Sequence, residues 1–230
     1  MSEVNESGQP VGRRLAGWDS PPMISHAVLI GRYVVLRPLQ LAHAGQVYSA
    51  LEGSADESWT YMPFGPFRSV SELEDTFRSL LALPDWLPYV VEVGGRVEGF
   101  ESYLRITPRD GALEIGSIVY SSRLQRTTAA TEAAYLLLRH AFESGYRRVE
   151  WKCDDLNEPS RRAGERLGFR YEGTFRNATH YKGRNRDTAW FAITVEEWDG
   201  IRTALEKWLD PANFDSKGQQ IHSLSNLRHL

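Results

Sequence analysis

The chain has 230 residues, of which 41% are hydrophobic and 25% are charged, and its formal net charge is −3. This composition describes a globular protein with ample length for a core, and the negative charge gives no electrostatic reason to expect a nucleic-acid partner. A single cysteine excludes an internal disulfide, no Cys/His cluster has metal-ligand spacing, and no apolar run approaches membrane-spanning length. The N-terminus lacks the apolar core of a signal peptide, so we expect a cytoplasmic protein that uses neither a metal nor a membrane.

The two ends of the chain differ in composition from its middle. Residues 1–22 are rich in Gly, Pro, Ser and charged residues, which predicts a tail that drapes over the body with Trp18 as an anchor. The polar stretch at the other end predicts a second, partly ordered tail. We therefore expect an N-terminal extension over residues 1–30, one domain over residues 31–209 and a C-terminal tail over residues 210–230.

The first part of the expected domain combines a strand, helices and an aromatic segment. Residues 33–38 predict a strand, and residues 41–51 predict a short helix. Residues 58–67 include four aromatic residues and two prolines, so the segment is too apolar for a solvent loop and its composition indicates a lining. Ser71 and Glu74 have capping-box spacing and predict the start of the next helix.

Strand signals dominate from residue 87 onward. Three runs separated by short turn signals, 87–93, 97–106 and 113–120, predict an antiparallel meander. A helix over 129–143 leads to a strand over 148–153, and because a crossover helix joins parallel strands, we expect this strand to run parallel to 113–120. The order is completed by a short helix capped by Ser160, strands over 169–175 and 187–193, and a helix over 195–209 with Thr194 and Glu197 as its capping box.

The segment from Leu124 to Ala133 follows the strand over 113–120 and opens the next helix with small residues. The first N–H groups of a helix have no intrahelical partner, so they favour an anion such as a phosphate. The chain contains neither Gly-x-Gly-x-x-Gly nor Gly-x-x-x-x-Gly-Lys-Ser/Thr, so neither a dinucleotide-binding fold nor a nucleotide triphosphatase is indicated. An ordinary helix start with Thr127 or Thr128 as N-cap fits the same residues, and both interpretations stay open.

Two motifs resemble those of the GNAT N-acetyltransferases. The acetyl-CoA loop of that family has the pattern Gln/Arg-x-x-Gly-x-Gly/Ala, and the matching positions here are Gln125, Arg126, Thr127, Thr128, Ala129 and Ala130, with Thr128 in place of the first glycine. The second motif, Asn-x-x-Ser followed by a short helix and Leu-Gly-Phe, is matched from Asn157 and Ser160 to Phe169. Residues 31–38 and 131–133, with Asn157 and Ser160, look most like the branch that includes the ribosomal-protein N-terminal acetyltransferases.

The resemblance covers residues 31–193 and implies the acyl-CoA N-acyltransferase fold, an α+β fold with a mixed, mostly antiparallel sheet and flanking helices. In that fold the strands matching 113–120 and 148–153 run parallel and splay apart. The resemblance puts the pantetheine of acetyl-CoA in this gap and its pyrophosphate on the amides of residues 125–130. The backbone of Ile118, Val119 and Tyr120 would then face the thioester.

Acetyl transfer to an amine needs a neutral nitrogen, a polarised thioester carbonyl and a proton for the departing thiolate. The resemblance implies Glu114 as the carboxylate that takes the ammonium proton; the alternative is a carboxylate paired with a nearby arginine. Ser160 would protonate the thiolate, a role that is compatible with capping a helix. The tyrosine that many family members use as general acid has Gly164 at its position.

Further residues are candidates for holding the two substrates, Asn157 through the resemblance and the others through their position and aromatic composition. Asn157 would hold the arm of CoA, or would act only as a turn residue. An acceptor site would be formed by Trp59, Tyr61, Phe64 and His180, for which the alternatives are an aromatic core cluster and a solvated turn histidine. Cys153 ends an apolar strand and is interpreted as a small core hydrophobe.

The leading hypothesis is an N-acetyltransferase that moves an acetyl group from acetyl-CoA to a primary amine of a small molecule, peptide or protein by direct attack in a ternary complex. Thr128 and Gly164 each replace a residue that this chemistry commonly uses. The alternative is therefore a catalytically silent acyl-CoA-binding or interaction module. The sequence names no acceptor, and it leaves a homodimer open.

Overall fold

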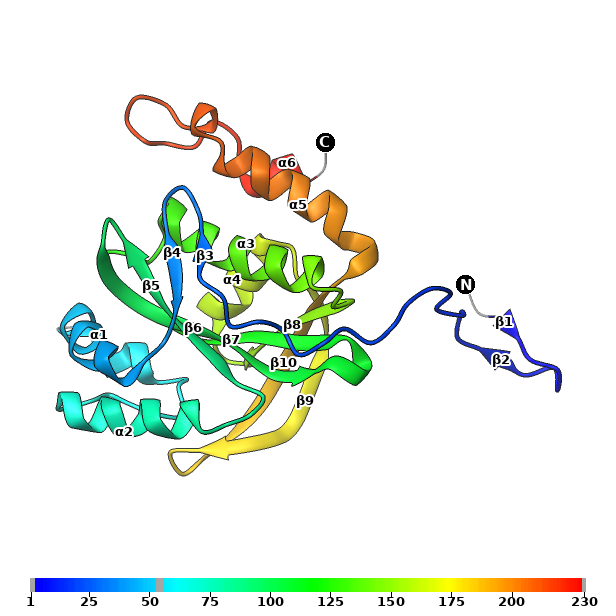
Figure 1. Ribbon diagram of the computed structural model, residues 1–230, viewed down its shortest axis with the longest axis horizontal. Helices are drawn as coiled ribbons and strands as arrows, with labels where there is room; N and C mark the ends of the chain where they lie inside the picture. Colours follow the sequence, from blue (N-terminus) through cyan, green and yellow to red (C-terminus); the bar gives the residue numbers. More distant parts are fainter. Residues whose placement is uncertain (1–2, 53–55, 229–230) are drawn as a thin grey trace.

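The computed structural model of the chain describes residues 3–52 and 56–228. Its centre is an eight-stranded sheet in the order β3-β4-β5-β6-β7-β8-β10-β9 (Figure 1). All neighbouring strands are antiparallel except β7 and β8, so the expected mixed, mostly antiparallel sheet is confirmed. The strands are β3 (Leu29–Ile30), β4 (Val35–Pro38), β5 (Leu87–Val93), β6 (Arg96–Thr107), β7 (Ala112–Tyr120), β8 (Arg148–Asp154), β9 (Arg170–Tyr181) and β10 (Arg184–Thr194).

Helices lie on both faces of this sheet. One face carries α1 (Ala44–Leu51) and α2 (Val70–Leu81), and the other carries α3 (Thr128–Glu143), α4 (Glu158–Leu167) and α5 (Val195–Leu209) (Figure 1). The flanking helices of the expected fold are therefore present. Short 3-10 helices span Leu41–His43, Asp56–Trp59, Pro108–Asp110 and Pro211–Asn213.

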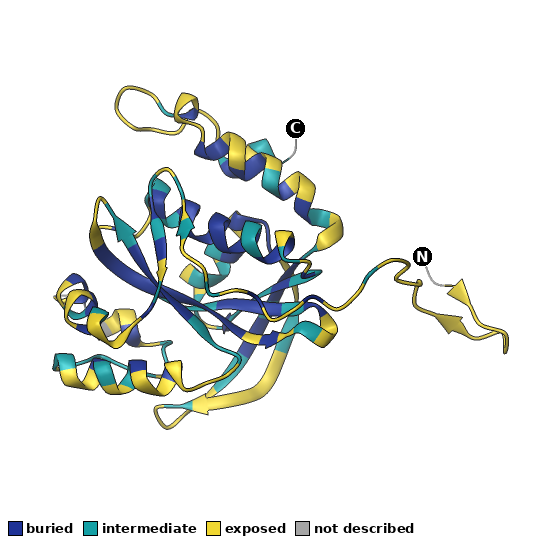
Figure 2. Cartoon of the chain, viewed as in Figure 1, coloured by how far each residue is buried: buried dark blue, intermediate teal, exposed yellow. Residues whose placement is uncertain are grey.

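Each helical layer encloses its own core. The larger core lies between the sheet and α3, and the smaller one lies under α1 and α2, where Phe77 packs on Phe100 with ring centroids 5.4 Å apart. Figure 2 shows the central strands and most of α3 in the colour of buried residues. α3 is apolar around most of its circumference because it lies between the sheet and α5, where Phe142 stacks on Trp198.

The helix starts test three of the predicted caps. Thr194 and Glu197 form the capping box predicted for α5. The box predicted from Ser71 and Glu74 is wrong, because α2 begins two residues earlier with Ser69 as its N-cap, and the Ser69 hydroxyl accepts the amide of Glu72. Ser160 is not the N-cap of α4 either: that role belongs to Asn157, whose side chain accepts the amide of Ser160.

Both ends of the chain contain structure that the composition did not indicate. A small hairpin joins β1 (Glu3–Val4) and β2 (Pro10–Val11) and projects from the body (Figure 1), after which the Trp18 ring lies against Arg147. At the other end α6 (Leu224–Leu227) packs through Leu224 into the main core. Residues 1–2 and 229–230 of the two expected tails lie outside the described residues. Across the residues that the structure describes, no helix has the length and apolar character needed to cross a membrane.

Candidate active site

β7 and β8 separate part of the way along their length. They are paired only at Ala112–Arg148, Leu113–Val149 and Glu114–Glu150, and their remaining residues have no register with each other. A register shift against β6 coincides with the positive φ of 52° at Ser117, so β7 also carries a bulge at this point. The predicted splay of the two parallel strands is therefore present, and residues 118–120 lie on the edge that faces the gap.

The loop after β7 ends in a nest of unpaired amides at the start of α3. Thr127 is the N-cap, as one interpretation predicted, and its hydroxyl accepts the amide of Ala130 at 3.2 Å. Within the described chain the amides of Arg126, Thr128 and Ala129 have no acceptor, whereas those of Gln125 and Thr127 bond to carbonyl groups of the loop. Three free donors thus lie within four residues at a helix N-terminus, an arrangement that suits a pyrophosphate.

Thr128 does not obstruct this nest. The left-handed conformation falls on Arg126, with a φ of 61°, and Thr128 is the first residue of α3. A β-branched side chain is tolerated there because the backbone at that position is helical. The exposed Gln125 also stabilises the loop, since its side-chain amide donates to the carbonyl of Tyr120 at 2.9 Å.

Glu98 holds the beginning of the same loop. Its buried carboxylate accepts the Ser121 hydroxyl at 2.7 Å and pairs with Arg123 at 2.9 Å. Burial raises the pKa of this carboxyl, but the hydrogen bonds from Arg123 and Ser121 outweigh burial and leave the pKa lowered. The loop is therefore fixed by a charged anchor that sequence reasoning did not identify.

The start of α4 lies at the opposite wall of the gap. The side-chain oxygen of Asn157 caps the helix by accepting the amide of Ser160 at 3.2 Å, and its amide nitrogen has no acceptor among the described residues. The two interpretations of Asn157 are therefore compatible. The oxygen serves the turn, while the nitrogen keeps two protons for a carbonyl of a bound ligand.

Ser160 belongs to a small cluster with Trp151 and Cys153. The Trp151 indole donates to the Ser160 oxygen at 3.1 Å, so the hydroxyl proton of Ser160 stays available as a donor. Burial raises the pKa of the Cys153 thiol, and a hydrogen bond with Ser160 partly opposes this effect. Cys153 is a buried core residue, as predicted.

Trp151 also explains the glycine at position 164. A Cβ atom built on Gly164 would lie 3.2 Å from Cδ1 of Trp151, which is already a tight contact. A tyrosine at this position would therefore need the indole to move. The indole occupies the space of that side chain and presents its N–H to Ser160 instead.

Glu114 belongs to the last pair between β7 and β8, at the vertex where the two strands separate, and it is nearly fully buried. Its Oε2 lies 3.2 Å from Arg105 Nε and 3.1 Å from Lys152 Nζ, so the arginine pair that one interpretation predicted is present, with a lysine added. Burial raises the pKa of the Glu114 carboxyl, and the charges of Lys152 and Arg105 partly oppose the rise. Glu114 thus combines a raised pKa with a position at the point where the strands part.

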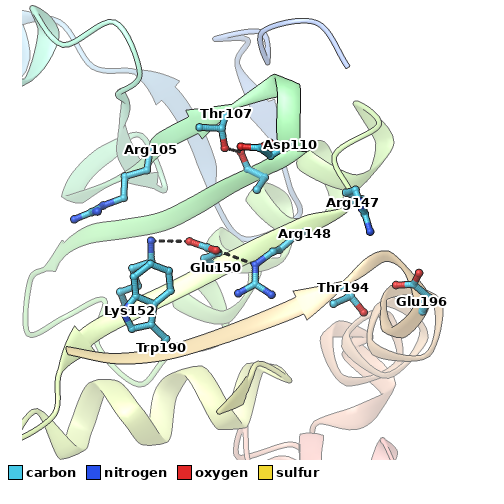
Figure 3. Close-up of a pocket in the computed structure, with 11 residues that line it drawn as sticks. Arg105, Thr107, Asp110, Arg147, Arg148, Glu150, Lys152, Trp190, Thr194 and Glu196 are labelled. Atoms are coloured by element: carbon cyan, nitrogen blue, oxygen red, sulfur yellow. Dashed lines mark hydrogen bonds and ion pairs between the residues drawn. The ribbon is translucent and has the colours of Figure 1, made fainter. Parts of the chain in front are cut away.

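Lys152 connects this vertex to a polar pocket of about 550 Å³ on the sheet face that α3 does not cover (Figure 3). It pairs with Glu150 at 2.6 Å, and its Nζ lies 3.7 Å above the ring of Trp190. The alternation of polar and apolar residues along β8 could have placed positions 148, 150 and 152 on one face. The partner of Lys152 across the sheet could not have been named, because it depends on register.

The expected acceptor residues do not form one group. Trp59 is only 4% exposed and packs on Phe64 and Phe67, as the alternative core interpretation predicted, while Tyr61 and Phe64 are half-buried. His180 is expected to follow a strand, but β9 extends to Tyr181 and therefore includes it. Its side chain is exposed within the β9–β10 hairpin. The carbonyl of Trp59 accepts the Lys182 ammonium at 2.7 Å, so the aromatic segment and this hairpin are in contact.

Glu101 on β6 has a buried carboxyl group that contacts Tyr120, the last residue of β7. Oε2 of Glu101 accepts the Tyr120 hydroxyl at 2.5 Å, and its Oε1 has no partner in the described part of the chain. Burial raises the pKa of the Glu101 carboxyl to about 7, and the hydrogen bond from Tyr120 limits the rise. A protonated Glu101 is therefore the stable form in the folded protein over a range where an unfolded glutamate is ionised.

This gives a stability prediction with a defined sign. Because the folded pKa lies above the ordinary value of 4.5, the folded state holds a proton that the unfolded state has lost, and stability falls as the pH rises from about 4.5 to about 7. The fall is about 3 kcal/mol at 1.36 kcal/mol per pKa unit. We expect Glu101→Gln to remove this loss, so that urea unfolding shows a gain over the wild type at pH 8 but not at pH 4.5. The exposed Glu165→Gln serves as the control; equal pH slopes for wild type and Glu101→Gln would contradict the assignment.

Comparison with known proteins agrees with this geometry. A family model described as an acetyltransferase (GNAT) domain matches residues 34–170, more than half of the chain. The crystal structure of a GCN5-related N-acetyltransferase from Brucella melitensis is 40% identical, with a TM-score of 0.91 over 94% of this chain and 100% of that one.

Two further relatives are more distant. The putative ribosomal N-acetyltransferase YdaF of Bacillus subtilis (strain 168) is 26% identical over 136 residues, which are 55% of this chain and 73% of YdaF. The structure of Mycobacterium smegmatis RimJ in complex with CoA-disulfide is 25% identical, with a TM-score of 0.63 over 72% of this chain and 83% of that one. The family match and the likeness to the Brucella protein cover the splayed strands, the amide nest and α4, and the chain therefore belongs to the GNAT family of N-acetyltransferases and is an acyltransferase.

Proposed function

We propose that this chain transfers an acetyl group from acetyl-CoA to a primary amine by direct attack in a ternary complex. The observation that carries the proposal is the nest of free amides at Arg126, Thr128 and Ala129, next to the gap between β7 and β8. The nest would hold the pyrophosphate, and the Asn157 amide would hold a carbonyl of the pantetheine. RimJ of M. smegmatis, a relative in the same family, was solved with a CoA derivative, which supports this donor.

The reaction joins the acceptor nitrogen to the thioester carbon and breaks the carbon–sulfur bond. The edge of β7 at residues 118–120 would offer amide donors to the carbonyl oxygen, where negative charge develops. Ser160 would give its proton to the departing thiolate, because its oxygen accepts the Trp151 indole and its hydroxyl hydrogen is not used in that bond. Glu114, at the vertex with a raised pKa, would receive the proton of the amine, directly or through water.

The role of Ser160 gives the first functional test. We expect Ser160→Ala to lower kcat by about 100-fold or more, from the lower end of the range for general acid–base catalysis upward, with little change in the KM for acetyl-CoA. Ser79→Ala on the exposed surface of α2 is the matched control. Full turnover by Ser160→Ala, measured as release of CoA thiol, would remove Ser160 from the mechanism.

A silent acyl-CoA-binding module is the other candidate function, and the structure weakens its two motivating observations. Thr128 leaves the nest open, and Trp151 occupies the space above Gly164 while orienting Ser160. Formation of acetylated product from acetyl-CoA and an amine panel distinguishes the two functions, since binding of CoA is common to both. The cytoplasmic location and a homodimer stay predictions, and light scattering of the purified chain tests the homodimer.

A further inference from the structure

The end of β8 beyond the vertex presents different groups to the two faces of the sheet. Cys153 faces the core under α4, and the next residue, Asp154, faces the other way. Both oxygens of the Asp154 carboxylate are already used: one accepts the Leu156 amide at 2.9 Å and the other accepts the Tyr181 hydroxyl at 2.7 Å. This buried anion is therefore satisfied by neutral donors.

Arg186 lies beside this group without an anion of its own. Its guanidinium carbon is 5.9 Å from the centre of the Tyr181 ring, and its charge lowers the pKa of Cys153, the neighbour of Ser160. None of the described residues forms an ion pair or hydrogen bond with the side chain of Arg186, and its Nε is buried without an acceptor. The side chain is half-buried, so Arg186 is not an ordinary solvated arginine.

The surrounding cations make the contrast clear. Near the end of β8, Arg161 pairs with Asp155 and Lys152 pairs with two glutamates, and at the start of the strand Arg148 pairs with Glu172 at 2.5 Å. A partly buried cation that lacks a partner is costly, and a guanidinium is shaped to bind a carboxylate through two parallel hydrogen bonds. Of the two half-buried arginines near the end of β8, Arg161 has a carboxylate partner and Arg186 has none in the described structure.

Lys182 adds a second positive charge on the same β9–β10 hairpin. Its ammonium donates one proton to the carbonyl of Trp59 and has no carboxylate partner among the described residues. Tyr61, from the segment that follows Trp59, lies close enough to Tyr181 to raise its pKa. Two cations therefore lie where this segment meets the β9–β10 hairpin, and the buried Asp154 beside them is already satisfied.

We propose that the acceptor carries a carboxylate near its amine, that Arg186 binds this carboxylate, and that the acceptor is therefore an amino acid or an amino-acid-like molecule. This inference rests on the proposed acetyl transfer and specifies its substrate class. Arg186 is a specificity residue: it takes no part in bond making, and it holds the acceptor so that the amine points toward the gap where the thioester ends. A diamine or a neutral amine would leave its charge unmatched.

The test uses matched acceptor pairs that differ only in the carboxylate: L-serine and L-serinamide, L-phenylalanine and its amide, and β-alanine and its amide. An amide also changes the pKa of the amine, so the informative quantity is the acid-to-amide ratio of kcat/KM compared between wild type and variants. We expect the wild type to favour at least one acid over its amide. In Arg186→Gln that ratio should fall at least tenfold, mainly through the KM of the acid, while kcat for the amide is kept.

Two further variants make the result specific. Arg184→Gln removes an exposed arginine from the same strand and should leave the ratio unchanged, whereas Arg186→Lys keeps the charge without the planar fork and should recover part of the preference. An equal ratio in wild type and Arg186→Gln, or a wild type that favours the amide in every pair, would overturn the inference while the acetyl transfer stands. No turnover of any acid or amide would overturn this inference, and the proposed function would fall with it only if the amine panel also gave no acetylated product.

Discussion

A proline at position 128 is expected to weaken the binding of CoA about 10- to 100-fold and to leave the fold intact. Thr128 is the first residue of α3, where proline is well tolerated because its N–H has no intrahelical partner. Thr127 before it is extended, with a φ of −101° and a ψ of 168°, as a residue before proline requires. The substitution therefore deletes one donor of the amide nest and little else.

The magnitude follows from the charge of the ligand. A hydrogen bond to an ionised group contributes about 1.5–3 kcal/mol, which corresponds to the expected loss in affinity. Isothermal titration with CoA measures it directly. Val70→Pro is the matched control, since Val70 is the first residue of α2, also follows an extended N-cap and lies in the other helical layer. Equal affinities for the wild type and Thr128→Pro would place the pyrophosphate elsewhere.

The largest effect on stability is expected for Glu132→Ala. Glu132 is a buried residue of α3, and its carboxylate accepts the amides of Arg32, Tyr33 and Val34 at 2.9, 2.6 and 3.0 Å. Alanine leaves these three donors without an acceptor, at about 1–3 kcal/mol for each one that water does not reach. We expect a loss of roughly 4 kcal/mol, a large part of the 5–15 kcal/mol that holds a typical domain together.

Urea unfolding at pH 7 measures this loss, and two variants bracket it. Glu132→Gln keeps one carbonyl oxygen and should fall between wild type and alanine, while Glu143→Ala removes an exposed glutamate from the end of the same helix and should change little. Gly31 belongs to the same arrangement, because a Cβ atom there would lie 2.4 Å from Glu132 Oε2. A loss below about 1 kcal/mol in Glu132→Ala would mean that water replaces the carboxylate.

The order of the elements could be predicted because each is encoded locally. Alternating apolar residues and glycine turns mark the meander, and the strand-helix-strand arrangement around α3 requires β7 and β8 to be parallel. Helix starts were harder when two residues were equally suitable as caps. At α4 both Asn157 and Ser160 fit, and the structure uses Asn157, so that the Ser160 hydroxyl turns to Trp151 instead of the helix end.

The candidate site was predictable only where it depends on the backbone of one segment. The loop before α3 could be located from its residues, but the shift of the left-handed conformation to Arg126 could not, and this shift is why Thr128 is acceptable there. Contacts between side chains of different strands could not be predicted from the sequence. The pairing of Glu114 with Lys152 and the isolation of Arg186 depend on register and bulges that no local pattern specifies.

The three-residue contact between β7 and β8 divides the sheet into a block of five strands, β3 to β7, and a block of three, β8 to β10. The amide nest belongs to the first block, and α4 with Ser160 and Arg186 belongs to the second. The distance between the two substrates therefore depends on the angle between the two blocks. That angle is set by the packing beneath the vertex, at residues such as Leu113 and Val149. Relatives with the same site residues can accordingly differ in the size of acceptor they admit through substitutions in the core alone.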